Sequence, residues 1–422
     1  MSQVARDRGN AKRLGAYYTD EIVADFLVRW AIRSPVDTVL DPGFGGGIFL
    51  RCAAKRTSEL GGSPADRIRG VEIDPETHSE VGRELHAQCG LAPSKLICCD
   101  FFDLEPGSIQ ATVVVGNPPF IRYQRFAGRS RAVALRRAQS QGVELSQLAS
   151  SWCPFLVHAV SMVEPRGRLA MVLPFEMTHA YYARPGLEFL GKAFGRITFL
   201  SFREKLFPDL SEDTLLLLAE DKGGASRGFF WRDFPNAEAL QGSNLPGCRV
   251  GNASRLDGAS LCRGEERLVE YFLPRKVREL YAELKARPEV RSLGDLAYAG
   301  IGYVSGANDF FHVSPSEVQA WHIPTRFLRR AVLKGRAFAG LLFTERDWLE
   351  GLSRGDTGYL LSINGEDTLP DGLLRYLKTG EAFGVPQTFK CRNRSPWYCV
   401  PYVTCPDAFL TCMSGGKAHN GR

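Results

Sequence analysis

The first candidate site in the chain is a glycine-rich turn, Asp41-Pro42-Gly43-Phe44-Gly45-Gly46-Gly47. The turn follows a short apolar stretch at 36–40, which we expect to be a strand, and it precedes an expected helix at 49–55. Glycine has no side chain to hold a ligand away from the backbone, and the N–H groups at the start of a helix attract polar ligands. The turn therefore predicts a binding site, although a tight strand-to-helix connection without a ligand explains the glycines equally well.

Carboxylates follow the next two apolar stretches, IRGVEI (68–73) and KLICC (95–99). Glu72 stands at the end of the first stretch, where an acidic residue in nucleotide-binding folds accepts hydrogen bonds from ribose hydroxyls. Asp100 follows the second stretch beside Phe101, so a carboxylate and a ring could hold an adenine by its amine and its face. Each acid alone is more often a surface or capping group, but acids at three consecutive strand ends favour a nucleoside site.

A second candidate site is Asn117-Pro118-Pro119-Phe120, which follows the apolar stretch 111–115. The prolines have no backbone N–H, so they fix the chain and leave carbonyl oxygens free to accept hydrogen bonds. The Asn117 side-chain oxygen and the Pro118 carbonyl could accept from an exocyclic amine while Phe120 stacks on the base. An ordinary Asn-Pro turn is the alternative, but a position at the same sheet edge as the acids favours a substrate site.

Strands that alternate with helices must position both sites. Apolar residues at helical spacing from Ile22 to Trp30 predict an early helix that Thr19 caps. Later strands are expected at 167–174, 197–202 and 214–220. This alternation predicts an α/β fold with a mostly parallel sheet that binds its ligands at the carboxyl ends of its strands.

The chain has 422 residues, more than a single core usually supports. After Asp221 the composition changes to a stretch rich in Gly, Asn and Ser. We therefore expect a first domain at 1–222, a linker region at 223–270 and a second domain at 271–422, which a helix at 275–286 opens.

The composition is that of an ordinary folded chain, 44% hydrophobic and 24% charged. No apolar stretch reaches the roughly 20 residues of a membrane span, and the start lacks the apolar core of a secretory signal, so we expect a cytoplasmic protein without membrane contact. Eleven cysteines occur without a C-x-x-C pair, and the spacing of the last four does not match zinc sites. We therefore expect reduced thiols and no metal.

Five segments occur in a familiar order and spacing, namely GAYYTD, DPGFGGG, GVEIDPE, CDFFDL and GNPPF. They resemble the motifs of gamma-class (TaqI-like) adenine-N6 DNA methyltransferases, which use S-adenosylmethionine, and the resemblance covers residues 15–220. It implies a Rossmann-like class I methyltransferase domain, whose mostly parallel sheet has seven strands including one antiparallel strand. A mixed α+β target recognition domain would follow.

The resemblance also implies a role for each matching residue. In the cofactor site, Tyr18 and Thr19 would border the methionine end, Asp41 with Gly43, Gly45 and Gly47 the amino-acid part, Glu72 the ribose, and Asp100 and Phe101 the adenine. The catalytic residues that hold the target adenine would be Asn117, Pro118, Pro119 and Phe120. Phe207 would stack on the same base, although it could also be an ordinary core residue.

The reaction implied is a direct displacement on the cofactor's methyl group. The adenine amine is a poor nucleophile because its lone pair is delocalised, and hydrogen bonds to Asn117 and Pro118 would draw that lone pair out of conjugation. The base must first leave the duplex, so aromatic faces would offset the unstacking. Two motifs depart from the family pattern: Phe120 replaces the commoner tyrosine, and Gly43-Phe44 replaces a small residue followed by cysteine.

Basic residues with aromatic neighbours form three runs almost free of acids, at 121–143, 320–340 and 374–400, in a chain of net charge +6. One such run is usually a solvated surface, but three favour a polyanion such as double-stranded DNA. The stretches 293–315 and 389–401 also resemble parts of the specificity domains of these enzymes. Candidates for DNA contact are Arg122, Arg125, Arg329, Arg330, Lys334, Lys390, Arg392, Arg394, Trp397 and Tyr398, of which the last two could equally be core residues.

Other activities fit parts of the pattern. Glutamine methyltransferases that act on release factors share the Asn-Pro-Pro motif, RNA base methyltransferases are a second rival, and a chain truncated in its specificity domain could keep DNA binding alone. The short stretch before GAYYTD and the long basic second half favour a site-specific DNA adenine methylase. We expect a monomer, either solitary or paired with a separate restriction endonuclease, whose recognition sequence depends on side-chain placement in the groove.

Overall fold

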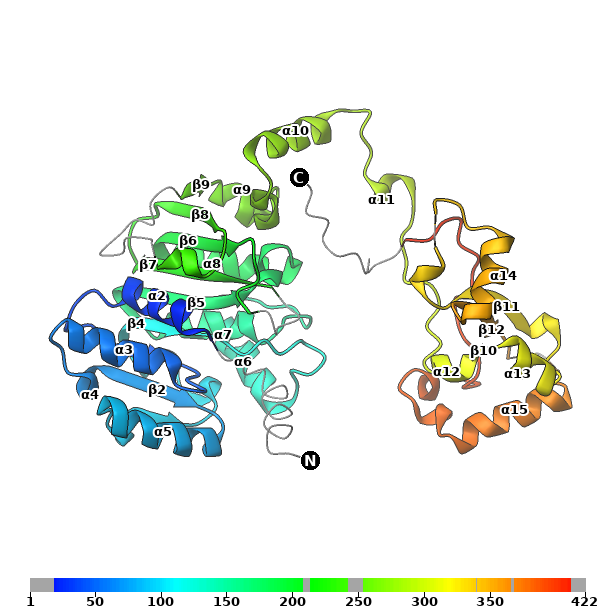
Figure 1. Ribbon diagram of the computed structural model, residues 1–422, viewed down its shortest axis with the longest axis horizontal. Helices are drawn as coiled ribbons and strands as arrows, with labels where there is room; N and C mark the ends of the chain where they lie inside the picture. Colours follow the sequence, from blue (N-terminus) through cyan, green and yellow to red (C-terminus); the bar gives the residue numbers. More distant parts are fainter. Residues whose placement is uncertain (1–18, 208–212, 242–252, 339, 366–367, 411–422) are drawn as a thin grey trace. The chain divides into compact units, whose positions relative to one another are not determined.

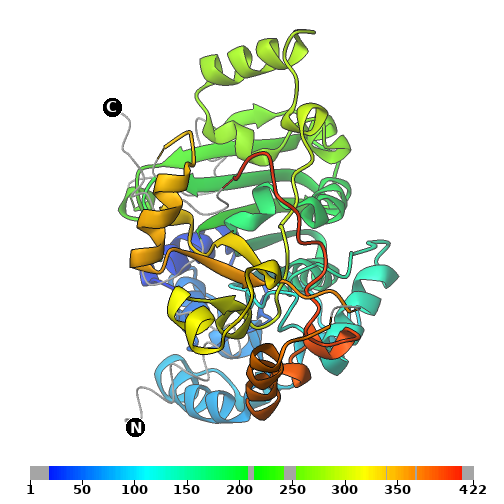
Figure 2. The ribbon, with the colours of Figure 1, turned by 90° about the vertical axis from the view of Figure 1, so that its right-hand side faces the viewer.

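The computed structural model describes residues 19–207, 213–241, 253–338, 340–365 and 368–410. These residues divide into two compact units, one that ends at Arg287 and one that begins at Pro288. Figure 1 and Figure 2 show the ribbon in two views, coloured along the sequence.

A sheet forms the centre of the first unit, and its nine described strands follow the order β3-β2-β1-β4-β5-β7-β6-β8-β9. The strands are β1 (Val39–Asp41), β2 (Ile68–Glu72), β3 (Leu96–Cys98), β4 (Ala111–Gly116), β5 (Val163–Pro174), β6 (Phe194–Phe202), β7 (Thr214–Lys222), β8 (Gly228–Phe234) and β9 (Ser254–Leu256). β7 runs antiparallel to β5 and β6, whereas β3, β2, β1, β4 and β5 are parallel to their neighbours in this series. The first seven positions of the sheet therefore confirm the predicted fold class, with one antiparallel strand among seven.

The central strands are apolar without alternation because helices cover both faces of the sheet. All of β1 is buried, as are five of the six residues of β4. The register pairs Asp41 with Gly70 and Leu40 with Val114, so β1, β2 and β4 end at the same edge. This register brings the residues that follow these strands together.

Two groups of helices pack on the sheet of the first unit (Figure 1). The first group is α2 (Glu21–Ala31), α3 (Ile48–Glu59) and α5 (Pro75–Cys89), with the short α4 (Pro64–Arg67) beside α3. The second group is α6 (Gly128–Ser140), α7 (Trp152–Ser161) and α8 (Arg184–Ala193). Residues 152–160 of α7 are all buried, as expected for a helix that is apolar almost all round.

The start of α2 differs from the expectation. Its cap is Asp20, whose carboxylate accepts a hydrogen bond from the Ile22 N–H at 2.8 Å, so the predicted cap at Thr19 is wrong. Thr19 instead accepts a hydrogen bond from Asn117, 98 residues along the chain. A tertiary contact thus takes the hydroxyl that local sequence would assign to the helix.

The described residues of the segment 223–270, expected to be a linker region, instead add two strands to the sheet. β8 pairs with β6 in parallel, and β9 pairs with β8 in antiparallel fashion. The side chains of Phe229, Trp231 and Phe234 are buried there. The helices α9 (Gly258–Arg263) and α10 (Arg275–Ala286) follow within the same unit, so the chain divides after Arg287 rather than near 222.

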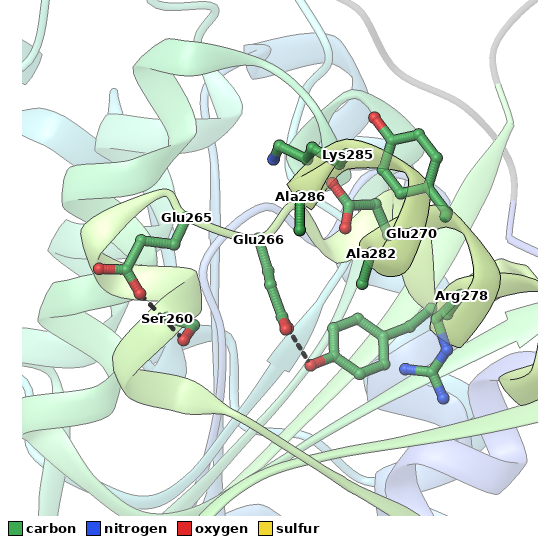
Figure 3. Close-up of a pocket in the computed structure, with 10 residues that line it drawn as sticks. Ser260, Glu265, Glu266, Glu270, Arg278, Ala282, Lys285 and Ala286 are labelled. Carbon is green, nitrogen blue, oxygen red and sulfur yellow. Dashed lines mark hydrogen bonds between the residues drawn. The ribbon is translucent and has the colours of Figure 1, made fainter. Parts of the chain in front are cut away.

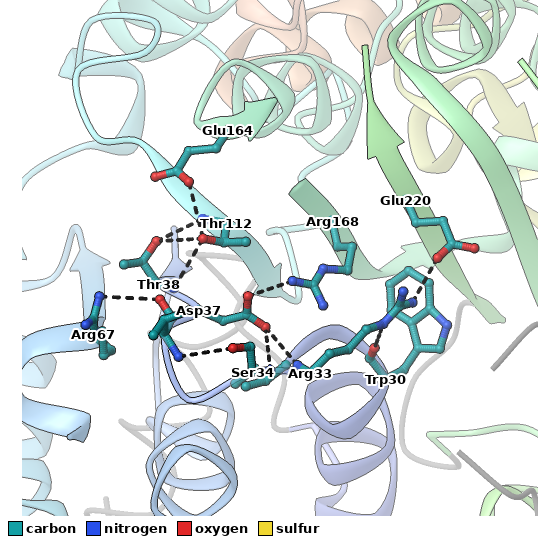
Figure 4. Close-up of polar contacts among 12 residues, drawn as sticks. Trp30, Arg33, Ser34, Asp37, Thr38, Arg67, Thr112, Glu164, Arg168 and Glu220 are labelled. Atoms are coloured by element: carbon teal, nitrogen blue, oxygen red, sulfur yellow. Dashed lines mark hydrogen bonds and ion pairs between the residues drawn. The ribbon is translucent and has the colours of Figure 1, made fainter. Parts of the chain in front are cut away.

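A buried ion pair stabilises the opposite edge of the sheet, at the amino ends of β1 and β5 (Figure 4). The Arg168 guanidinium donates to an Asp37 oxygen at 2.8 Å, and the two side chains are only 9% and 5% exposed. The other Asp37 oxygen accepts from the backbone N–H groups of Arg33 and Ser34, and Arg33 also pairs with Glu220 at 2.9 Å. This network joins β1, β5 and β7 away from the candidate sites.

The second unit has its own core around a small antiparallel sheet in the order β10-β12-β11. Its strands are β10 (His312–Val313), β11 (Leu328–Val332) and β12 (Thr357–Leu361), and its helices are α11 (Leu293–Leu296), α12 (Asn308–Phe311), α13 (Pro315–Ala320), α14 (Glu345–Arg354) and α15 (Asp371–Ala382). This unit has the mixed α+β character expected of the second domain. Within the described residues of both units, no helix has the length and apolar character needed to cross a membrane.

Candidate active site

The glycine turn lies between the end of β1 and the start of α3. Gly45 and Gly47 have φ angles of +45° and +75°, a left-handed conformation that residues with a Cβ rarely adopt. A Cβ on Gly47 would come within 2.8 Å of the Val81 side chain, whereas a Cβ on Gly45 would meet no atom within 4 Å. Gly45 therefore presents its backbone to open space, which leaves room for a ligand against the turn.

Asp41 lies under this turn and is fully buried. Its Oδ1 accepts a hydrogen bond from the Gly43 N–H at 3.1 Å, while its Oδ2 has no partner in the structure. Burial raises the pKa of Asp41 to about 8, and the nearby charge of Glu72 adds to the rise. A buried carboxyl with a free oxygen suits a cationic ligand group, such as the ammonium of an amino-acid moiety.

Glu72 connects the turn to the end of β2. One carboxylate oxygen accepts from the Gly45 N–H and the other from the Asp74 N–H, both at 2.9 Å. A carboxylate can accept further hydrogen bonds at each oxygen, so these two leave acceptor capacity for a ribose. Asp41, Glu72 and the glycine turn therefore form one connected group, as the sequence predicted.

The predicted adenine residues follow β3. Asp100 is half-buried and accepts a hydrogen bond from the Phe102 N–H at 3.0 Å. Phe101 is only 4% exposed, and its ring packs against Phe155 and His158 with centroids 4.8 Å and 4.5 Å apart. The Phe101 ring thus belongs to the core, and its stacking on an adenine stays a prediction.

His158 is a neighbour of this segment that the sequence did not reveal. It is fully buried on α7, and its Nε2 lies 3.1 Å from the Phe101 carbonyl oxygen. Burial lowers the pKa of His158 to about 4, so the imidazole is neutral and can donate to that carbonyl. This hydrogen bond connects α7 to the Asp100–Phe101 segment and holds the segment in place.

Asn117 follows β4 at the same edge, and the structure brings it together with Thr19. Its Nδ2 donates to the Thr19 hydroxyl at 3.2 Å, while its Oδ1 is buried and has no partner. A Cβ on Gly116 would lie 2.9 Å from Asp41 Oδ1, so the chain entering Asn117 passes directly beside the buried acid. An acceptor without a donor at the end of a central strand is the main chemical feature of the site.

The loop after Asn117 is held by a residue that the motifs do not include. The hydroxyl of Ser151 accepts from the Ile121 N–H at 2.8 Å and donates to the Pro119 carbonyl. Phe120 between them is 7% exposed. No residue type or spacing in the sequence marks Ser151, because the contact joins positions about 30 residues apart.

The remaining predicted site residues are less informative. Tyr18 lies outside the described residues. Phe207 is 8% exposed and belongs to the core of the first unit, so its role as a second stacking ring stays a prediction. In the described part of the chain, no group of three or more His, Cys, Asp or Glu side chains could hold a metal ion.

Several candidates for DNA contact are exposed. Arg122 and Arg125 are exposed in the loop after Phe120, and Arg329 is exposed on β11. Arg330 on the same strand pairs with Glu345 at 2.8 Å, and Lys334 lies 4.0 Å from Asp356. Lys390 and Arg392 are exposed, and their cationic groups lie 5.6 Å and 5.2 Å from the centre of the Phe389 ring. These side chains can reach a phosphate backbone, and their contact with DNA stays a prediction.

Three other candidates take part in the core of the second unit. Arg394 donates to the backbone carbonyls of Ser305 and Val304. Trp397 and Tyr398 are partly buried against this core, and the Trp397 ring lies 5.6 Å from that of Phe310. Their geometry favours the core alternative that the sequence left open.

A separate cavity of about 390 Å³ lies between α9 and α10 (Figure 3). Three glutamates line it, and two of them have partners within the chain: Glu266 accepts from the Tyr271 hydroxyl, and Glu265 pairs with Arg263 at 2.6 Å. Arg278 lies over the Tyr271 ring at 4.3 Å. Because Glu265 and Glu266 are already paired within the chain, we assign no ligand to this cavity.

The strand order, the antiparallel β7 and the glycine turn after β1 define a class I S-adenosylmethionine-dependent methyltransferase fold. A solved structure of a DrdV–DNA complex has a similar fold, with a TM-score of 0.55 and 11% identity over 85% of this chain and 44% of that chain. Residues 1–180 match the family model "N-6 DNA Methylase", and residues 265–418 match "Type II methyltransferase M.Eco57I, C-terminal domain". The first 180 residues are therefore similar to N-6 DNA methylases, in agreement with the adenine-N6 chemistry that the five motifs indicated, and the gamma class stays a prediction.

Two curated relatives are type II methyltransferases. M.AccI of Acinetobacter calcoaceticus is 20% identical over 408 residues, which cover 92% of this chain and 69% of that protein. M.BstVI of Geobacillus stearothermophilus is 23% identical over 206 residues, which cover 42% of this chain and 36% of that protein. The chain thus spans about two thirds of M.AccI and a smaller share of M.BstVI.

Proposed function

We propose that this chain transfers a methyl group from S-adenosylmethionine to N6 of an adenine that is flipped out of double-stranded DNA at a specific sequence. The observation that carries the proposal is the buried Asn117 Oδ1, an acceptor without a partner at the carboxyl edge of the sheet. An exocyclic amine is the group that such an acceptor suits. The family match supplies the substrate class, an adenine in DNA.

Residues around the glycine turn would hold the cofactor. The free Oδ2 of Asp41 faces no donor and fits the cofactor's ammonium group, Glu72 has acceptor capacity for the ribose, and Asp100 fits the adenine amine. When bound, the cofactor would supply an electrophilic methyl group on a sulfonium sulfur. Cofactor contact at each of these residues is part of the proposal.

The chemical role of Asn117 follows from its geometry. Thr19 accepts from its Nδ2, and this contact turns the Oδ1 the other way, where it can accept from the adenine amine. That hydrogen bond strengthens as positive charge develops on N6, so it stabilises the transition state more than the ground state. The Pro118 carbonyl would accept the second amine hydrogen, and Phe120 would stack on the base.

The partners are proposals as well. The exposed arginines after Phe120 and those of the second unit would contact DNA phosphates. The relatives' classification as type II methyltransferases suggests a separate restriction endonuclease of the same specificity. The chain would act in the cytoplasm, where genomic DNA is accessible.

The test is incubation of the full chain with S-adenosylmethionine and unmethylated DNA, followed by sequencing that detects N6-methyladenine. We expect methylation at one recurring sequence with the wild-type protein and none with Asn117→Ala. Asn236→Ala, a change of the same kind that removes the acceptor for the Ala239 N–H, is the matched control and should stay active. Cofactor binding without methylation of any DNA would contradict the proposal, and RNA and a glutamine-bearing protein would then be assayed.

A further inference from the structure

We propose that Ser151 is a positioning residue of the methyl-transfer site, which holds the Asn-Pro-Pro-Phe loop in the shape that aims the Asn117 oxygen at the target amine. The inference rests on the proposed function and adds to it a residue outside all five motifs. Within the described residues, the hydrogen bonds of Ser151 reach Pro119, Ile121 and Phe155 and none of them reaches the glycine turn or its acids. Its effect is therefore on the base side of the site rather than on the cofactor side.

Three hydrogen bonds connect Ser151 to the loop. Its hydroxyl accepts from the Ile121 N–H at 2.8 Å and donates to the Pro119 carbonyl, and its own N–H donates to the Ile121 carbonyl at 2.9 Å. The residue is 1% exposed, so water cannot replace these bonds. Ser151 thus fixes the chain on both sides of Phe120.

The loop needs an anchor from elsewhere in the fold. Pro118 and Pro119 have no N–H, so this part of the chain cannot form a regular hydrogen-bond ladder after β4. The Ile121 N–H is the first backbone donor beyond Phe120, and it is the one that Ser151 engages. Without the hydroxyl, the Ile121 N–H and the Pro119 carbonyl lose these buried partners.

The anchor itself is rigid. Ser151 immediately precedes α7, which is buried along nearly its whole length and packs on β5. The next residue, Trp152, donates from its indole N–H to the Tyr182 hydroxyl at 2.9 Å, and this bond connects the helix start to the segment after β5. A rigid support makes the loop position precise, and a displacement of about 1 Å at a reacting group can lower a rate about 100-fold.

The test uses the full chain and two kinds of measurement. Hydrogen exchange of the unliganded protein reports the loop directly, without cofactor or DNA. Steady-state kinetics and cofactor titration then separate kcat from cofactor affinity. Both use unmethylated DNA that contains the sequence that the wild-type protein methylates. Ser161→Ala is the matched control, because it removes a hydroxyl that donates to the His158 carbonyl at the other end of the same helix.

For Ser151→Ala we expect exchange in residues 117–126 to become at least about tenfold faster, while β4 stays unchanged. We also expect kcat to fall roughly 10- to 100-fold and the cofactor Kd to stay within about twofold. Ser161→Ala should match the wild type in all three measurements. If Ser151→Ala does not fold, Ser151→Cys keeps the volume with a weaker hydrogen-bonding group and should show the same pattern with a smaller effect.

Three outcomes would overturn the inference. Unchanged exchange in 117–126 would mean that Ser151 does not hold the loop, and faster exchange with an unchanged kcat would reduce the contact to a structural one. A loss of cofactor affinity equal to the loss of kcat would mean that Ser151 acts on the cofactor residues rather than on the loop that holds the target base. Wild-type protein without methylation would refute the proposed function instead, and the exchange result would still report on the loop.

Discussion

Replacing Asp41 with Asn should stabilise the unliganded first unit at neutral pH. Asp41 is fully buried, and one of its oxygens has no hydrogen-bond partner. Asn keeps an oxygen that can accept from the Gly43 N–H, has nearly the same volume and carries no charge at any pH. The substitution therefore removes the ionisation of this group and leaves the packing in place.

The magnitude follows from the raised pKa of Asp41, about 8 in the folded chain against 3.8 in the unfolded chain. A carboxyl whose pKa is raised by folding contributes stability at low pH, and this contribution disappears as the pH rises toward the folded pKa. Between the unfolded and the folded pKa, each pH unit lowers the free energy of unfolding by about 1.4 kcal/mol, and the total loss at pH 7 is about 4 kcal/mol. Between about pH 5.5 and pH 7.5, the free energy of unfolding of Asp41→Asn relative to wild type should rise by about 2.5 kcal/mol.

The assay compares the exchange rates of the buried β4 amides in wild type and variant at each pH. These amides exchange through global unfolding, and the ratio of the two rates cancels the pH dependence of the chemical step. A change of about 2.5 kcal/mol corresponds to a change of roughly 70-fold in this ratio. Asp66→Asn, which removes an exposed carboxylate of α4, is the control and should leave the ratio constant. A ratio for Asp41→Asn that does not change with pH would refute the assignment of a raised pKa to this group.

Two further predictions concern arginines. Arg168→Ala should lower the free energy of unfolding by about 3–5 kcal/mol, because it leaves the buried Asp37 carboxylate without its charged partner. The double variant Asp37→Asn with Arg168→Met should recover most of that loss. Urea titration of both variants measures the difference, and equal stabilities would contradict the prediction. Arg125→Ala should weaken DNA binding at every sequence and reduce the slope of log K against log salt concentration by about 1. Arg394→Ala should destabilise the second unit and leave that slope unchanged, because the Arg394 guanidinium donates to backbone carbonyls. A salt slope that changes with Arg394→Ala and not with Arg125→Ala would refute this assignment of the two arginines.

The sequence predicted the sheet edge correctly because parallel strands end together, so residues that follow consecutive strands must meet. Asp41, Glu72 and Asn117 could be brought to one site by this rule alone. The cap of α2 was predicted wrongly because a local rule cannot detect that Asn117 engages Thr19 from a distant part of the chain. The helix cap falls to the neighbouring Asp20 instead.

The two strands after Lys222 were missed for a different reason. Their flanks are rich in glycine and serine, and this composition is typical of linkers. The alternation of buried Phe229 and Trp231 with less buried neighbours was the available signal for β8. Ser151 and His158 carried no such signal, because their importance comes from contacts with chain segments about 30 and 57 residues away.

The helix α7 has a consequence for the evolution of the site. Ser151 at its start holds the loop of the proposed base pocket, and His158 within it supports the segment of the proposed adenine pocket of the cofactor. Seven residues separate these two supports, about 10 Å along a helix axis. A substitution that shifts α7 would move both pockets together, so the spacing between methyl donor and acceptor could stay constant while the surrounding sequence diverges.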